Sequence, residues 1–175
     1  MKTLPVLLCL VAIVSASRAA TPPPPPNSPA AGITLRDFKL TGNLSSNRAV
    51  FTLTAVAKVE SSRGGSLELL SGGVALTELG PHSKWKLRID GDAYVLSFDR
   101  SGEFPIQIKF SAAVRQIDGW NVAQFQVAPT ALQRIVLQGL AADTQFQFSG
   151  AARAERSGAE FVSYLPTDVA VNLAW

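Results

Sequence analysis

The sequence is poor in the side chains on which most hydrolases and metal proteins depend. It contains one cysteine, Cys9, and one histidine, His82. A structural zinc site needs several Cys or His ligands, and a Ser-His-Asp triad would have to use His82, which lies in the expected turn Gly80–Ser83. No G-x-S-x-G motif precedes a helical pattern. We therefore expect a protein that is not an enzyme and that has no metal or other cofactor.

Charged residues are few and dispersed. The 16 Lys and Arg residues and 13 Asp and Glu residues give a net charge of +3. In the densest basic stretch, Lys84–Arg88, the cations alternate with apolar residues as on the outward face of a strand, so we expect no nucleic-acid binding. Asp90, Asp92 and Asp99 surround one expected hairpin and offer oxygen ligands for Ca²⁺, but their spacing matches no calcium-binding loop.

The first 19 residues have the pattern of a secretory signal peptide. Lys2 precedes an apolar run over residues 4–14, and the small residues Ser17 and Ala19 are placed as at a signal-peptidase site. The run is shorter than the roughly 20 residues that cross a bilayer. Cleavage after Ala19 would remove the cysteine and two basic residues, which leaves a net charge of +1 and no disulfide. We expect an exported envelope protein, periplasmic or extracellular, without membrane contact after cleavage.

A proline-rich linker over residues 20–32 follows the signal peptide. Its five consecutive prolines, Pro22–Pro26, favour an extended polyproline II conformation that cannot join a β-sheet. The linker predicts a spacer or a disordered leader in front of one domain over residues 33–175.

The most regular pattern of the chain lies in residues 104–127. Every second residue from Phe104 to Val114 is apolar, which is the period of a strand buried on one face. Asp118-Gly119 suits a tight turn because glycine accepts a positive φ, and Trp120 begins an expected return strand. We interpret this stretch as a central β-hairpin.

The other segments also read as short strands. A change of apolar phase at Arg36-Asp37 predicts a β-bulge, Thr41–Asn47 reads as a polar turn, and Asp90-Gly91 suits a second tight hairpin. No segment has the period of a long helix. About ten strands without a helix predict an all-β fold, an antiparallel β-sandwich of the immunoglobulin-like or jelly-roll-like kind.

A weak internal repeat is visible in the domain. Leu67–Glu78 can be laid over Val162–Leu173 without a gap, so that five apolar positions and a turn coincide. The domain would then hold one and a half copies of a unit of roughly 100 residues. This hypothesis predicts an unpaired strand edge, self-association through edge strands, and a chain that is the N-terminal part of a larger protein.

A candidate ligand face consists of glutamines and one tryptophan. All eight glutamines lie between residues 107 and 147, mostly at outward strand positions, and Trp120 lies among them. Amides bond sugar hydroxyls and an aromatic ring packs against sugar C–H groups, which favours a glycan ligand; a plain solvated sheet face is the alternative. The residues chosen for this face are Trp120, Gln107, Gln124 and Gln126.

Three functional hypotheses remain at the level of sequence. The first is a non-catalytic exported module for binding, scaffolding or assembly in the cell envelope, with a protein or a glycan as its partner. The second is a small outer-membrane β-barrel, because Val169–Trp175 alternates and ends on an aromatic residue, and so resembles the last strand of such barrels. The third is a glycan-binding module.

Overall fold

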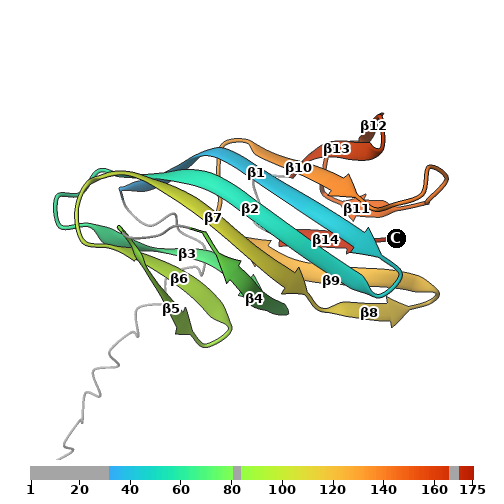
Figure 1. Cartoon of the computed structure of the whole chain (residues 1–175), viewed down its shortest axis with the longest axis horizontal. Helices are drawn as coiled ribbons and strands as arrows, with labels where there is room; N and C mark the ends of the chain where they lie inside the picture. The colour runs from blue at the N-terminus through green and yellow to red at the C-terminus, as the bar shows by residue number, and fades with distance from the viewer. Residues whose placement is uncertain (1–31, 81–83, 166–169) are drawn as a thin grey trace, which may run out of the picture.

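The computed structural model describes residues 32–80, 84–165 and 170–175, and these residues form fourteen β-strands in two sheets packed face to face (Figure 1). The all-β sandwich expected from the sequence is thereby confirmed. The expected signal peptide, the linker up to residue 31, and His82 lie outside the described residues. Within the described ranges there is no helix that is long and apolar enough to cross a membrane.

The first sheet has seven strands in the order β12-β13-β10-β1-β2-β7-β4. Their bounds in that order are Glu155–Ser157, Glu160–Leu165, Gln133–Gln138, Ile33–Ser45, Arg48–Val59, Gly102–Ala112 and Val74–Leu79. Strands β1 and β10 run parallel, and the other neighbours in this sheet are antiparallel. The sheet is therefore mixed, with β12 and β4 at its two edges.

The second sheet also has seven strands, six of them in the order β11-β14-β9-β3-β6-β5. Their bounds in that order are Gln147–Ser149, Ala170–Ala174, Trp120–Val127, Gly65–Gly72, Ala93–Phe98 and Lys86–Asp90. The seventh strand, β8 (Val114–Ile117), pairs with β9. All pairs in this sheet are antiparallel, and β5 forms one of its edges.

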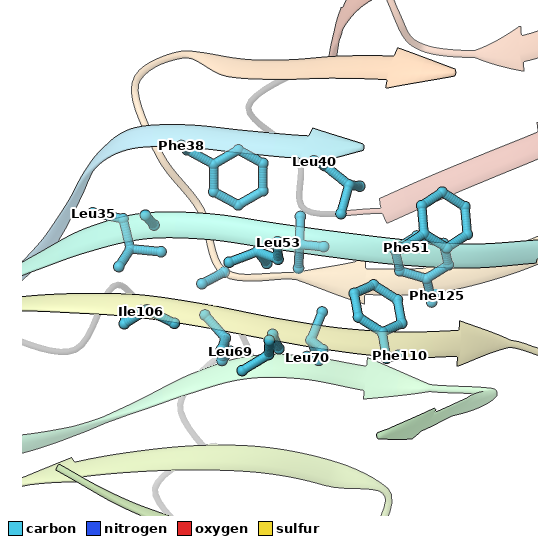
Figure 2. Close-up of a cluster of buried hydrophobic side chains, with 14 of the residues drawn as sticks. Leu35, Phe38, Leu40, Phe51, Leu53, Leu69, Leu70, Ile106, Phe110 and Phe125 are labelled. Atoms are coloured by element: carbon cyan, nitrogen blue, oxygen red, sulfur yellow. The ribbon is translucent and has the colours of Figure 1, made fainter. Parts of the chain in front are cut away.

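The core fills the space between the sheets because each long strand turns its apolar side chains inward. Along β2, buried residues alternate strictly with partly exposed ones, as a period of two requires. At one end of the core, Phe51 stacks on Phe110 with 5.5 Å between ring centroids, and Phe125 from the second sheet lies 4.9 Å from Phe51 (Figure 2). Three strands from both sheets thus meet in one aromatic cluster.

Two buried tryptophans, in different parts of the sequence, connect the two sheets. The indole Nε1 of Trp85, just before β5, donates to the carbonyl oxygen of Pro105 in the first sheet at 3.1 Å. The indole Nε1 of Trp175, just after β14, donates to the carbonyl oxygen of Ser45 at 2.9 Å. Because a buried indole N–H needs a partner, these hydrogen bonds fix how the layers are placed against each other.

Strand β1 is longer than expected. The predicted bulge is confirmed: the register shifts between Arg36 and Lys39, and Asp37 has φ of 52°. The predicted polar turn at Thr41–Asn47 is too long: β1 continues to Ser45 and pairs with β2, and only Ser46 and Asn47 form the turn. Gly42 gives this stretch the character of a turn in the sequence. In the structure it occupies an inward position of β1, where it is buried and leaves room for the ring of Phe51.

The expected hairpin over residues 104–127 is correct only at its turn. Asp118 and Gly119 have φ of 50° and 84°, as a tight turn with positive φ at both central residues requires. The strand before the turn, however, breaks at Ala113: β7 belongs to the first sheet and β8 to the second. Only β8 and β9 form the hairpin.

The break at Ala113 is one half of a strand exchange between the sheets. Strand β3 leaves the second sheet at Gly72 and continues as β4 in the first, beside the point where β7 leaves the first sheet and continues as β8 in the second. The N–H of Ala113 donates to the carbonyl oxygen of Gly73 at 2.7 Å. We call this the strand exchange, defined by residues 72–74 and 112–114.

The two segments of the hypothetical internal repeat also change sheets, but in opposite directions. The first passes from β3 in the second sheet to β4 in the first. The second passes from β13 in the first sheet to β14 in the second, and residues 166–169 between them lie outside the described residues. The repeat itself stays a prediction.

Candidate binding surfaces

Three of the four residues predicted for a ligand face share one face of the molecule. Along β9 the residues Ala123, Phe125 and Val127 are buried in the core, so the alternate positions of Trp120, Gln124 and Gln126 belong to the outer face of the second sheet. Gln124 and Gln126 are exposed, and Trp120 is half-buried. Gln107 is exposed on β7, on the outer face of the first sheet. The structure therefore brings three of these residues together and separates the fourth from them.

Each of the two outer glutamines of β9 lines a hollow in the surface. Gln124 contributes to a hollow of about 220 Å³ whose other lining residues are Gly73, Ala113, Arg115, Ile117 and Val122. Gln126 contributes to one of about 390 Å³ that is also lined by Glu68, Ser71, Gly72, Asp90, Asp92 and Ala93. The strand exchange separates the hollows, since Gly72 lines one and Gly73 the other. Both hollows lie where the backbone leaves its sheet.

Each of these glutamines lies opposite one polar, uncharged residue of a neighbouring strand. Gln124 lies opposite Asn172 of β14, and Gln126 lies opposite Ser71 of β3, whose hydroxyl is 3.5 Å from the Gln126 Oε1. Amides and hydroxyls each donate and accept hydrogen bonds. This part of the sheet is suited to binding a ligand with many hydroxyl or amide groups.

A third hollow lies around Gln107 on the opposite side of the molecule. It has a volume of about 470 Å³ and is lined by Asp37, Thr54, Ala55, Val56, Pro105, Ile106 and Gln107. The bulge in β1 places Asp37 at this hollow. Sequence reasoning missed the hollow because it depends on three strands, β1, β2 and β7, whose order in the sheet the sequence does not reveal.

Two of the three acidic residues considered for Ca²⁺, Asp90 and Asp99, lie beside cations. The carboxylate of Asp90 is 2.8 Å from Nη1 of Arg88, and that of Asp99 is 3.0 Å from Nζ of Lys86. Over residues 32–80, 84–165 and 170–175, no three side chains of His, Cys, Asp or Glu are grouped so that they could hold a metal ion.

The edge strand β5 is a surface that the sequence pattern did not single out. Four of its five residues are exposed, including Ile89, whose side chain is 68% exposed. Figure 1 shows β5 as the last strand of its sheet, with one long edge turned away from the sandwich. Among the described residues, no strand pairs with that edge.

The other sheet edges are shorter or obstructed. Strand β4 has an irregular register between Leu76 and Glu78, and the N–H of Leu76 donates to the hydroxyl of Tyr94 at 3.3 Å. Strands β11 and β12 have three residues each. Strand β8, which within the described part of the chain pairs only with β9, has four residues. Short lengths, bulges and charged side chains keep an edge from pairing with another strand; β5 carries three charged residues, but it is longer than β8, β11 and β12 and more regular than β4.

Comparison with known proteins identifies a similar fold but no family. No protein-family model matches the sequence, and no curated protein matches it. Among solved structures, native yeast LTA4 hydrolase aligns at 9% identity with a TM-score of 0.50, over 83% of this chain and 30% of the yeast protein. An M1 zinc metallopeptidase from Deinococcus radiodurans aligns at 8% identity with a TM-score of 0.47, over 82% of this chain and 42% of that one.

These alignments concern the fold alone. The chain spans less than half the length of either protein, and about nine in ten aligned residues differ. A shared fold does not transfer an activity, because function depends on the residues of a site.

Proposed function

We propose that this chain is an exported, non-catalytic β-sandwich module that acts in the cell envelope by binding or by assembly. The groups that it offers to a partner are the open backbone edge of a strand, side-chain amides and hydroxyls, and charged side chains, all held on a rigid core. The signal-peptide pattern of residues 1–19 supports export.

The observation that carries this proposal is the outer face of the second sheet. There, Gln124 and Gln126 project from a strand whose opposite face is fully packed, and each amide lines a hollow. Side chains on a rigid strand bind with little loss of backbone entropy, since the strand is already ordered. A partner that bonds both amides would span the strand exchange.

A glycan is the second candidate partner, and one specific observation favours it. Trp120 shares the outer face of β9 with both glutamines, so an aromatic ring and two amides lie along one strand. A sugar chain presents C–H faces to a ring and hydroxyls to amides. The exposed Ile117, opposite Trp120 on β8, adds apolar surface at the same end.

Binding to insoluble polysaccharides tests the glycan candidate. The chain is mixed with peptidoglycan, cellulose or chitin, and the bound fraction is measured after sedimentation. Trp120→Ala and the double change Gln124→Ala/Gln126→Ala should abolish binding, whereas Gln107→Ala should leave it unchanged, because Gln107 is the same residue type on the other sheet. Binding lost equally in all three variants would contradict a site on β9. If the unchanged chain bound none of these polymers, the glycan candidate would be rejected and a protein would be the remaining candidate partner.

A further inference from the structure

We infer that two copies of this chain associate by pairing their β5 strands, antiparallel and centred on Arg88, so that the second sheet runs continuously through a twofold-symmetric dimer. The inference rests on the assembly role proposed above and specifies the strand, the register and the partner. It starts from the backbone of β5, which forms the open edge of the second sheet.

The hairpin geometry fixes which backbone groups face that edge. Residues 91 and 92 form the turn between β5 and β6, and Asp90 is paired with Ala93. In a two-residue hairpin the flanking pair is hydrogen-bonded, and bonded and non-bonded pairs then alternate along the ladder. Lys86, Arg88 and Asp90 therefore direct their N–H and C=O groups to β6. Leu87 and Ile89 direct theirs outward.

The strand is self-complementary when it is paired with a reversed copy of itself. With Arg88 opposite Arg88, Leu87 of one copy faces Ile89 of the other, and both residues carry the outward backbone groups. Each of the two symmetry-related Leu87–Ile89 pairs then exchanges both of its backbone hydrogen bonds. If the register shifted by one residue, the outward N–H and C=O groups of one copy would face residues of the other copy whose own N–H and C=O groups already point to β6.

The side chains match in the same register. Lys86 of one copy lies opposite Asp90 of the other, on the outer face of the sheet, and this ion pair occurs twice by symmetry. On the inner face, Ile89 gains Leu87 of the partner copy as an apolar neighbour, which covers a side chain that is 68% exposed in one copy alone. Opposite-charge and apolar cross-strand pairs both favour this register.

The one unfavourable contact is between the two Arg88 side chains. Each is 2.8 Å from the carboxylate of its own Asp90, which offsets the repulsion. The existing pair of Lys86 with Asp99 is exposed at both ends, so exchanging it for the pair across the interface costs little. Five residues per strand make a small interface, and the dimer should be weak and dependent on concentration.

Single cysteines test the register, because Cys9 is the one cysteine of the chain and Cys9→Ser removes it. In the Cys9→Ser chain, Arg88→Cys places the two thiols opposite each other in a non-hydrogen-bonded pair, with Cα atoms about 4.5 Å apart, within the range of a disulfide. Lys86→Cys places its two thiols four residues out of register, about 13 Å apart along the strands. Asp90→Cys does the same, so both variants serve as matched controls.

Oxidation of the folded variants should convert Arg88→Cys to a disulfide dimer at least about tenfold faster than either control, since only its Cα distance permits the bond. Circular dichroism of each variant checks that the sandwich is intact. Faster cross-linking of Lys86→Cys or Asp90→Cys, or no dimer of a folded Arg88→Cys chain, would overturn the proposed pairing.

Charge reversal provides a readout without a disulfide. In sedimentation equilibrium, Lys86→Asp should weaken the dimer by placing Asp opposite Asp90, and the double change Lys86→Asp/Asp90→Lys should restore it. A chain that dimerises but is not trapped through Arg88→Cys would refute the β5 register and leave the assembly role standing. A monomer at every concentration would refute self-association, and the binding tests on β9 would then decide the proposed function.

Discussion

Replacing Gly42 with alanine tests how the core packs around the end of β1. The added Cβ would lie 2.5 Å from Cε1 and 2.9 Å from Cδ1 of Phe51, and 3.2 Å from a methyl of Leu137. Phe51 is fully buried and held by Phe110 and Phe125, so its ring has little space to move into. Gly42 does not have a positive φ, and the substitution therefore adds no backbone strain.

The expected magnitude follows from two opposing terms. Forcing one extra carbon into a packed core costs about 1–3 kcal/mol, and replacing glycine by alanine in a strand gains about 0.5–1 kcal/mol in entropy. The difference spans about 0–2.5 kcal/mol, so Gly42→Ala should lower the free energy of unfolding by about 1 kcal/mol, the middle of that range. Phe51→Leu, which removes three carbons, should lower it by about 2 kcal/mol. Because leucine lacks Cε1, the double variant should lose less than the sum, with a coupling of about 1 kcal/mol.

Urea denaturation of the four proteins of this cycle measures the coupling. Gly65→Ala is the matched control, because its Cβ would meet only the side chain of Ile33, with Cδ1 at 3.0 Å and Cγ1 at 3.6 Å, and it too has no positive φ. That variant should be as stable as the unchanged chain or slightly more stable. If Gly42→Ala costs no more than Gly65→Ala, or if the two changes of the cycle are additive, the packing argument for Gly42 is refuted.

Three further predictions concern other parts of the chain. Gln133 is 1% exposed; its Oε1 has no hydrogen-bond partner among the described residues, while its Nε2 donates to the carbonyl oxygen of Ala128 at 3.4 Å. Gln133→Leu removes both the unsatisfied oxygen and this long hydrogen bond, so the two effects oppose each other and the free energy of unfolding should change by less than about 1 kcal/mol in the same assay; a loss of more than about 2 kcal/mol would mean that the amide is fully satisfied. Trp175→Phe removes the indole donor to Ser45 and should cost about 1–2 kcal/mol, whereas an unchanged melting temperature would show that this link between the sheets contributes nothing. Residues 1–32 fused to alkaline phosphatase should direct an active, processed reporter to the periplasm, and retention of the full-length fusion in the cytoplasm would contradict the signal-peptide assignment.

The period-two pattern predicted most of the fold because the strands are packed on one face. Strands with large inward residues, such as β2 and β7, were evident from the sequence. The end of β1 was not, because one of its inward positions is Gly42, and a glycine flanked by Thr41 and Asn43 has the composition of a turn. Its burial becomes intelligible only with Phe51, a residue from the neighbouring strand.

The candidate ligand face was only partly predictable for a related reason. Alternation along β9 was enough to place Trp120, Gln124 and Gln126 on one face. The pattern of β7 is equally regular, but periodicity cannot say to which of two sheets a strand belongs, and Gln107 therefore lies on the far side of the molecule. The short break at Ala113 is the one local sign of the change, and alanine does not interrupt an apolar pattern.

The strand exchange has a consequence for how the protein folds. Residues 65–79 and 102–117 each supply strands to both layers, and Gly73 and Ala113 bond each other where the two segments pass. Each of these segments therefore ties the two layers together, because one of its strands belongs to the first sheet and the other to the second. Because the two segments bond each other where they cross between the layers, we expect the two layers to melt in a single cooperative transition.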